Sequence, residues 1–426
     1  MDINSLKKDM ILKKGVHYFD FAASALALKS VEKKIKSVLL TYANTHSDSA
    51  SNSFITQKHY ENARASLKKS LGLNDEFALI NTGTGSSAAI KKFEELLGIY
   101  APPKVRELYL SNLDKKRLPL VIVGAYEHHS NELSFREGLC ECVRVGLDER
   151  GELDFKELER ILKENLGRKI ITSFNLASNV TGILTDFKAL SNLARKYGAI
   201  VAFDASSFAP HAHVPCKYYD ALFISSHKLL GGVGGCGLLA IKKTLCGAKP
   251  TFAAGGTVGY VSRESANYLL NEESLEEAGT PGILQLIRAE KAFEIRDQIG
   301  LKLIKKQENA LTKHFFKRAD EFNAQFHTLT LYANHLKARL PIFALNIKGV
   351  SPYDLAYKLS HKFGIQTRAG CACAGPYAHD LLGLKEGQKL KQKPGWLRVS
   401  FHFTHELSDI DYFFDSLKSV VKRLEK

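Results

Sequence analysis

The sequence predicts an α/β fold in which a mixed, mostly parallel sheet is covered by helices on both faces. Strand-like and helix-like patterns alternate from about residue 77 to residue 242. Most of the strand-like runs are apolar at successive positions, which is typical of strands buried on both faces. The chain has 426 residues, of which 45% are hydrophobic, so we expect a large core and two domains.

Two amphipathic helices are predicted before the sheet. Apolar residues at helical spacing predict a first helix that extends through Tyr42, and the second is predicted from about Phe54 to Leu71. Further helices are expected from about Ala88, over Phe155–Asn165 and over Phe187–Tyr197. The predicted strands are Phe77–Asn81, Leu120–Gly124, Cys142–Gly146, Ile170–Asn175, Ile200–Asp204, Leu222–Ser225 and Gly237–Lys242.

Composition and charge narrow the class of protein. No apolar run approaches the roughly 20 residues of a membrane helix, and Asp2 precedes the first basic residues, which argues against a signal peptide. Seven cysteines at scattered positions form no disulfide framework, so we expect thiols in a cytoplasmic protein. The net charge of +15 lies largely along helical stretches such as Lys29–Lys36, which favours solvated helix faces or an anionic partner over a nucleic-acid surface.

The stretch Ala221–Gly237 indicates where chemistry is to be sought. A strand-like run ends in Ser225, Ser226, His227 and Lys228, and a glycine-rich segment follows, which would let backbone approach a ligand. Lys228 could be a solvated charge like most of the other basic residues. Its neighbours are instead those that a lysine forming a Schiff base requires.

The residues that follow the other predicted strands extend this pattern, because ligands in such sheets bind beyond the carboxyl ends of the strands. The segment Thr82–Ser87 could cradle a phosphate or only cap a helix. His128 and His129 could be zinc ligands or core histidines, although no further ligand stands at a zinc spacing, and we expect no metal site. Asp204 could be a helix N-cap. Together these residues describe a pyridoxal phosphate site, with the phosphate held by amides and hydroxyls and the aldehyde trapped by Lys228.

From Tyr18 to about Phe414 the chain resembles the class V aminotransferase family of fold-type I pyridoxal phosphate enzymes, and within it the cysteine desulfurase and selenocysteine lyase branch. The motifs that carry the resemblance are Glu127–Asn131, Ser178-Asn179, Asp204 with His211, Ser225–Gly231, Gly255–Thr257, Glu277–Pro281, Arg368–Ala374 and Trp396–Ser400. The resemblance implies a large cofactor domain over residues 21–283. A small α+β domain would comprise residues 284–426, with a last helix over Ser408–Leu424, together with an N-terminal arm over residues 1–20.

The resemblance also implies roles for individual residues. Lys228, Cys373 and His128 would be catalytic, and Arg398, Asn179 and Ala23 would bind the substrate. The expected cofactor-binding residues are Gly85, Ser86, Ser87, His128, Asn179, Asp204, Ser207, Ser225, His227, Lys228 and Thr257. Thr257 would reach the cofactor phosphate of a second subunit, which implies a homodimer.

Two of these roles have alternatives. A planar guanidinium suits Arg398 to clamp a substrate carboxylate, although it could also be a surface residue on an edge strand. Cys373 could attack the substrate sulfur as a thiolate, whereas Cys371 and Cys373 could also be inert or a redox-sensitive pair. If their loop is extended, the two side chains project to the same side roughly 7 Å apart and cannot replace each other.

The implied activity is the conversion of cysteine to alanine with a persulfide on Cys373, and a sulfur-acceptor protein as a further partner. The sequence departs from the family's pattern at three places: Ser207 replaces the usual glutamine, the phosphate loop reads Ser86-Ser87-Ala88, and Ala50 stands where a second histidine is common four residues after His46. These departures bear on the specific reaction. The alternatives are a class V aminotransferase, a selenocysteine or other pyridoxal phosphate lyase, and a basic protein that binds cofactor or nucleic acid without turnover.

Overall fold

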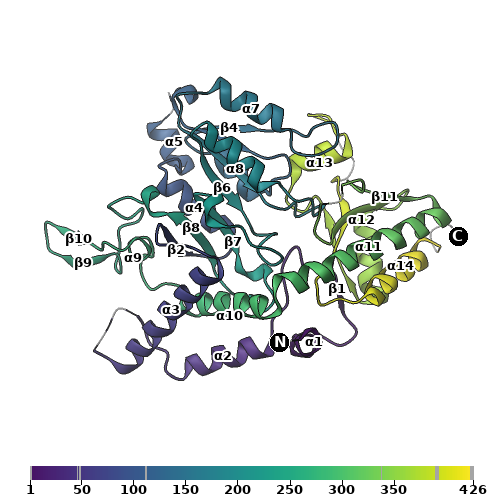
Figure 1. The fold of residues 1–426 in the computed structure, drawn as a ribbon, viewed down its shortest axis with the longest axis horizontal. Coiled ribbons are helices and arrows are strands. Elements are labelled where there is room, and N and C mark those ends of the chain that lie inside the picture. The colour runs from purple at the N-terminus through teal and green to yellow at the C-terminus, as the bar shows by residue number, and fades with distance from the viewer. Residues whose placement is uncertain are drawn as a thin grey trace.

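The structure, a computed structural model, describes residues 2–45, 47, 49–110, 113–336, 338–388 and 393–422. A seven-stranded sheet with its helices and a smaller four-stranded sheet lie side by side (Figure 1). Every helix in the described part of the chain is too short or too polar to span a bilayer.

The seven-stranded sheet is mixed and mostly parallel, as predicted. Its order is β2-β8-β7-β6-β5-β3-β4, and β8 alone runs antiparallel to its neighbours β2 and β7. Three strands have the predicted bounds, and the others differ by one or two residues at their ends. The strands are β2 (Phe77–Thr82), β3 (Leu120–Val123), β4 (Glu141–Arg144), β5 (Ile170–Asn175), β6 (Ile200–Asp204), β7 (Ala221–Ser225) and β8 (Gly237–Lys242).

Helices cover both faces of this sheet because successive side chains of a strand point to opposite sides. In β3, Leu120 and Ile122 belong to one buried cluster, whereas Val121 and Val123 belong to another. The first cluster includes residues of five of the helices given below, and the second includes residues of α4. The helices are α2 (Lys29–Leu39), α3 (Ser51–Ser70), α4 (Ser86–Leu96), α7 (Phe155–Glu164), α8 (Phe187–Lys196) and α10 (Ile283–Ile299).

The starts of α7 and α8 are fixed by aspartates. Asp154 and Asp186 each accept hydrogen bonds from two backbone N–H groups of the first helical turn, which is the usual N-cap arrangement. Asp204 is not such a cap, because turns and no regular helix follow β6 up to Val214. The alternative assignment of Asp204 as a helix cap is therefore wrong.

The four-stranded sheet is antiparallel, with the order β11-β12-β15-β14. The longest helix, α11, packs on this sheet: its Phe315 stacks on Phe343 of β12 with ring centroids 3.7 Å apart. The elements are α11 (Leu301–Phe326), β11 (Leu329–Leu331), β12 (Ile342–Ile347), α12 (Pro352–Phe363), β14 (Arg368–Gly370), β15 (Trp396–Ser400) and α14 (Leu407–Val421). The predicted end of the last helix at Leu424 lies outside the described residues.

The N-terminal segment packs against the smaller sheet. Phe19 is fully buried in the cluster that contains Phe315, and β1 (His17–Tyr18) pairs with β13 (Ile365–Gln366). Helix α1 (Ile3–Asp9) instead contributes Leu6 to a separate cluster with Phe21 and Leu28. The boundaries at residues 20 and 283 stay predictions, since residues of both sheets also share one buried cluster.

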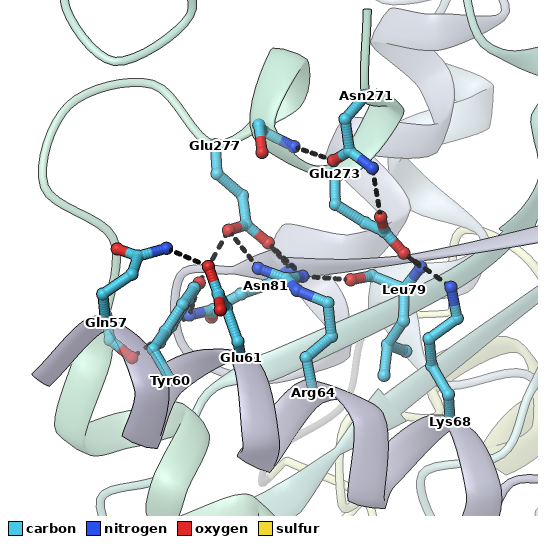
Figure 2. Close-up of polar contacts among 12 residues, drawn as sticks. Gln57, Tyr60, Glu61, Arg64, Lys68, Leu79, Asn81, Asn271, Glu273 and Glu277 are labelled. Atoms are coloured by element: carbon cyan, nitrogen blue, oxygen red, sulfur yellow. Dashed lines mark hydrogen bonds and ion pairs between the residues drawn. The ribbon is translucent and has the colours of Figure 1, made fainter. Parts of the chain in front are cut away.

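Side chains form hydrogen bonds with the backbone along the outer edge of β2, where no further strand of the described residues pairs with it. Glu277 accepts a hydrogen bond from the Asn81 N–H at 2.6 Å, two from Arg64 at 2.6 and 2.8 Å, and one from the Tyr60 hydroxyl at 2.6 Å (Figure 2). An unpaired strand edge would otherwise be open to another chain. This buried ionic network thus fixes the strand that leads into the segment Thr82–Ser87.

A second carboxylate acts in the same way two residues earlier along β2, at Leu79. Glu273 of α9 (Glu272–Glu276) accepts from the Leu79 N–H at 3.1 Å and from Lys68 at 2.9 Å (Figure 2). Arg64 also donates to the Leu79 carbonyl. The edge of β2 is therefore linked to α3 on one side and to α9 on the other.

We predict that Glu277→Gln lowers the free energy of unfolding by about 3–5 kcal/mol, because it leaves the buried Arg64 guanidinium without its counter-charge. Tyr60→Phe removes one hydrogen bond to the same carboxylate and should cost about 2 kcal/mol. Urea-induced unfolding measures both. Glu107→Gln is the matched control, since the Lys104–Glu107 pair is about 70% exposed on both sides, and its unfolding midpoint should not move. An equal midpoint for Glu277→Gln and the control would contradict this account.

Candidate active site

A cavity of about 280 Å³ lies at the carboxyl ends of β5, β6 and β7 and reaches the smaller sheet. It brings together most of the site residues that the sequence predicts. Those that line it are Ala23, Gly85, Ser86, Ser87, His128, Asn179, Asp204, Ser225, His227, Lys228, Cys373 and Arg398. Five further residues line it. Thr84, Arg368 and Ala372 belong to stretches that the sequence already indicated, whereas Ala22 and Ser206 were not assigned to the site from sequence.

Hydroxyl groups cluster at one end of the cavity, around the start of α4. The helix begins at Ser86, two residues earlier than predicted, after Gly85 with a φ of +82°. The Ser225 hydroxyl accepts from the Ser86 N–H at 2.8 Å and lies 3.2 Å from the Ser206 hydroxyl. A Cβ at Gly85 would lie 3.2 Å from the His227 ring and 3.3 Å from the Ser225 oxygen. These hydroxyls and the helix N-terminus form a suitable cradle for a phosphate.

Ser206 was missed because it carries no motif of its own. It lies between Asp204 and Ser207, and the tight turn after β6 points it at Ser225 on the neighbouring strand. The signal that could have found it is the run of small polar residues directly after a buried strand.

The Lys228 side chain ends among polar groups of the cavity. Its amine donates to the Ser207 hydroxyl at 3.2 Å. Burial lowers the pKa of this amine from its ordinary value of 10.5 to about 8, against the opposing effect of the Asp204 charge. A lysine that attacks a carbonyl must be unprotonated, so the cavity prepares Lys228 for this chemistry.

His128 faces the same space. Burial and the nearby Lys228 charge lower the pKa of His128 below its ordinary value, so the ring is neutral at physiological pH. Its Nδ1 lies 3.1 Å from the Ser130 hydroxyl, which contacts the Ser87 hydroxyl at 2.6 Å. No group of three or more metal-ligating side chains occurs among the described residues. A neutral, flat imidazole at this position can stack on a cofactor ring.

Glu127 holds the loop that carries His128. Its carboxyl group accepts from the Gly124 and Asn175 N–H groups and from the Asn131 amide, at 2.7–3.2 Å. Burial raises the pKa of Glu127 to about 8. This carboxyl group therefore joins the ends of β3 and β5, and its role is to position rather than to react.

Arg398 is buried, with an exposed fraction of 2%, and β15 lies between β12 and β14. The alternative of a surface arginine on an edge strand is therefore wrong. Arg398 donates to the Asn179 carbonyl at 2.9 Å and to Asp20 at 2.8 Å, whereas its Nε has no hydrogen-bond partner. Asp20 also pairs with Arg368 at 2.8 Å. Two arginines and one carboxylate at the cavity wall leave donors for an anionic group.

The loop of Cys373 is a turn and not an extended segment. Ala372 and Cys373 have φ values of +52° and +58°, and the Ala374 N–H donates to the Cys371 carbonyl at 3.1 Å. The condition of an extended loop, under which the two thiols would project to the same side, is therefore not met. Cys373 is exposed and lines the cavity, whereas Cys371 packs against the large buried cluster.

Two predicted residues do not line the cavity. Ser207 is not among the lining residues, although its hydroxyl accepts from the Lys228 amine. Thr257 is fully buried, and its hydroxyl donates to the Ala254 carbonyl at 2.8 Å. Its predicted contact with the cofactor of a second subunit is not tested by a single chain and stays a prediction.

The glycine-rich segment after Lys228 serves packing and not ligand contact. A Cβ at Gly232 would lie 1.9 Å from the Ser226 carbonyl oxygen, and one at Gly237 would lie 2.1 Å from the Gly85 carbonyl oxygen. None of these glycines lines the cavity. They let the chain fold back against the turn that carries Lys228 and against the phosphate cradle.

The residues present fit pyridoxal phosphate. The cavity supplies a cradle for the phosphate, a neutral imidazole, a buried carboxylate at Asp204 and an amine with a lowered pKa. Two buried polar atoms, Asn179 Oδ1 and Arg398 Nε, have no partner, and such atoms in a pocket are available to a ligand.

The comparisons with known proteins agree with this geometry. The family model of aminotransferase class-V matches residues 17–413. A probable cysteine desulfurase of Pyrococcus abyssi is 30% identical over 98% of both chains. A probable cysteine desulfurase of Streptomyces coelicolor is 26% identical over 99% of this chain and 97% of its own. The solved apo structure of cysteine desulfurase from Thermococcus onnurineus NA1 is similar over 99% of both chains, with a TM-score of 0.82 and 26% identity.

The pKa of Lys228 predicts how cofactor capture depends on pH. Only the unprotonated amine attacks an aldehyde, so the rate at which the cofactor-free protein captures pyridoxal phosphate should rise with pH around a midpoint of about 8. Absorbance follows capture, and borohydride fixes the product for mass spectrometry. Lys228→Ala is the control and should show no cofactor fixed at this position. Asp204→Asn should move the midpoint to lower pH, because the Asp204 charge favours the protonated amine. A midpoint near 10.5 would contradict the burial of the amine.

Proposed function

Because the chain belongs to the class-V aminotransferase family, we propose that it is a pyridoxal-phosphate-dependent cysteine desulfurase. It converts L-cysteine to L-alanine and leaves the sulfur atom as a persulfide on Cys373. The observation that carries this proposal is that an exposed thiol, a lysine amine and a buried arginine from three separate segments line one cavity. A transaminase needs the amine and the arginine, but it has no use for the thiol.

Residues on two sides of the cavity would hold the cofactor. Gly85, Ser86, Ser87 and Ser225 would bind its phosphate, and His128 would stack on its ring. Asp204 would pair with the ring nitrogen. Asn179 and His227, which line the cavity, and Ser207, which accepts from the Lys228 amine, would complete the site. When bound, the cofactor supplies an aldehyde that reacts with amines and a ring that accepts the electrons released at the α-carbon of the substrate.

Arg398 would bind the carboxylate of cysteine. Its hydrogen bonds to the Asn179 carbonyl and to Asp20 fix the guanidinium plane, and its Nε is free. A fixed guanidinium orients a carboxylate through two parallel hydrogen bonds. Ala22 and Ala23 form part of the wall and leave space for the small substrate. The Lys228 amine, once unprotonated, is placed to take the proton from the α-carbon and later to return it.

Cys373 then completes the reaction. Its thiolate attacks the sulfur of the substrate, a sulfur–sulfur bond forms, and the carbon–sulfur bond breaks. The electron pair of the broken bond stays with the carbon fragment, which becomes alanine when it gains a proton. The thiolate is the reactive form of cysteine, and the exposed position of Cys373 at the cavity gives it access both to the substrate and to an acceptor.

The partners follow from the same proposal. A persulfide on an exposed thiol requires a sulfur-acceptor protein with a nucleophilic group of its own. A homodimer would place Thr257 at the phosphate of the second subunit. The hairpin of β9 (Val258–Val261) and β10 (Ala266–Tyr268) supports this, since it extends from the body (Figure 1) and exposes Tyr260, Val261 and the nearby Leu270. All seven cysteines carry thiols and none forms a disulfide, which suits a cytoplasmic location.

We predict that the two thiols of the turn respond differently to substitution. Cys373→Ser should abolish alanine formation from cysteine, by at least about a thousandfold, because no other thiol of the described residues lines the cavity. The absorbance of the bound cofactor should be unchanged. Cys371→Ser is the matched control and should reduce the rate only modestly, since Cys371 packs against the core. Alanine is measured without any keto-acid acceptor.

Two outcomes would contradict this proposal. If Cys373→Ser forms alanine at the normal rate, the thiol is incidental and a transaminase or selenocysteine lyase becomes the better description. If alanine appears only when a keto acid is added, the protein is a transaminase.

A further inference from the structure

The turn that carries Cys373 is held from outside by two loops of the seven-stranded sheet. Asn179, which follows β5, donates from its side-chain amide to the Ala372 carbonyl at 2.7 Å. His129, which follows β3, donates its backbone N–H to the Cys373 carbonyl at 2.8 Å. The His129 Nε2 accepts from the Gly375 N–H at 2.8 Å. His129 therefore contacts the turn on both sides of Cys373.

These outside contacts are needed because the turn is strained. Ala372 and Cys373 are two successive non-glycine residues with positive φ. Such residues keep this conformation only where the surrounding structure fixes them. The single hydrogen bond inside the turn, from the Ala374 N–H to the Cys371 carbonyl, does not fix the orientation of the turn relative to the cavity.

The hydrogen bond that the Gly375 N–H donates to His129 shows which ring nitrogen of His129 carries a proton. A backbone N–H can only donate, so Nε2 must be unprotonated and the neutral ring carries its proton on Nδ1. The fit is close, because a Cβ at Gly375 would lie 3.0 Å from Nε2. Gly375 is also the first residue of α13 (Gly375–Leu382), so the ring meets this helix at its start.

We propose that His129 is a positioning residue for the reacting thiol. Its neutral imidazole and its backbone N–H hold the turn Cys371–Gly375 so that Cys373 faces the cavity that His128, the preceding residue, also lines. The inference rests on the proposed function, in which Cys373 is the nucleophile. Attack in line with a bond demands placement within about an ångström, and a shift of that size costs on the order of a hundredfold in rate.

The test compares His129→Ala with His129→Gln in the cofactor-loaded enzyme. In His129→Ala, kcat for alanine formation from cysteine should fall by about tenfold to a hundredfold, whereas KM and the cofactor absorbance stay unchanged, because Arg398 and Lys228 are not touched. The amide oxygen of His129→Gln can accept from Gly375 and should restore most of kcat. His361→Ala is the matched control, since His361 is exposed on α12 and contacts its own helix at Tyr357. Its kcat should equal that of the wild type.

Hydrogen exchange of the peptide over residues 371–377 gives a readout that does not depend on turnover. Exchange at the Gly375 amide should be at least about tenfold faster in His129→Ala than in the wild type, His129→Gln or His361→Ala. Unchanged exchange and unchanged kcat in His129→Ala would overturn the inference, as would equal kcat values for His129→Ala and His129→Gln. Failure of the proposed function is distinguishable, because it shows as normal alanine formation by Cys373→Ser and leaves the exchange result standing.

Discussion

The site depends on one buried amine beside one buried carboxylate. Asp204 ends β6, and Ser225 ends the parallel neighbour β7, so both lie at the same edge of the sheet. The short turn Ser226–Lys228 then brings the amine back over this edge. Burial lowers the pKa of the amine while Asp204 opposes the effect, which leaves a lysine that is reactive near neutral pH. The turn fits only because the glycines that follow it have no side chains.

The smaller sheet and its loops supply the arginine and the thiol that line the cavity. β15 places Arg398 against the cavity, and the turn after β14 places Cys373 there. Asp20, from the N-terminal segment, pairs with both Arg398 and Arg368. A buried ionic group of this kind fixes geometry more than it adds stability. The part of the cavity around Arg398 is therefore built from chain segments that lie 378 residues apart, and its geometry depends on how the two sheets pack.

Sequence reasoning predicted the large sheet well because its strands are apolar on both faces, and because parallel strands place their ends at one edge. That rule predicts that the residues after the strands, among them His128, Asp204 and Lys228, lie close together. The turn at Ala372 and Cys373 could not be predicted, since its positive φ values are imposed by hydrogen bonds from Asn179 and His129. These residues contact the turn across 193 and 246 positions of the sequence. The purpose of the glycines at 232 and 237 was also misread, because only the fold reveals what approaches them.

The proposed reaction passes sulfur from cysteine to Cys373. Mass spectrometry of the cofactor-loaded wild-type protein, after brief incubation with cysteine and without any acceptor thiol, tests this transfer. We expect the added mass of one sulfur atom on the peptide that contains Cys373, with fragment ions that place it on this residue and not on Cys371. A persulfide on Cys371 alone, or alanine formed with no sulfur on either residue, would contradict the proposed transfer.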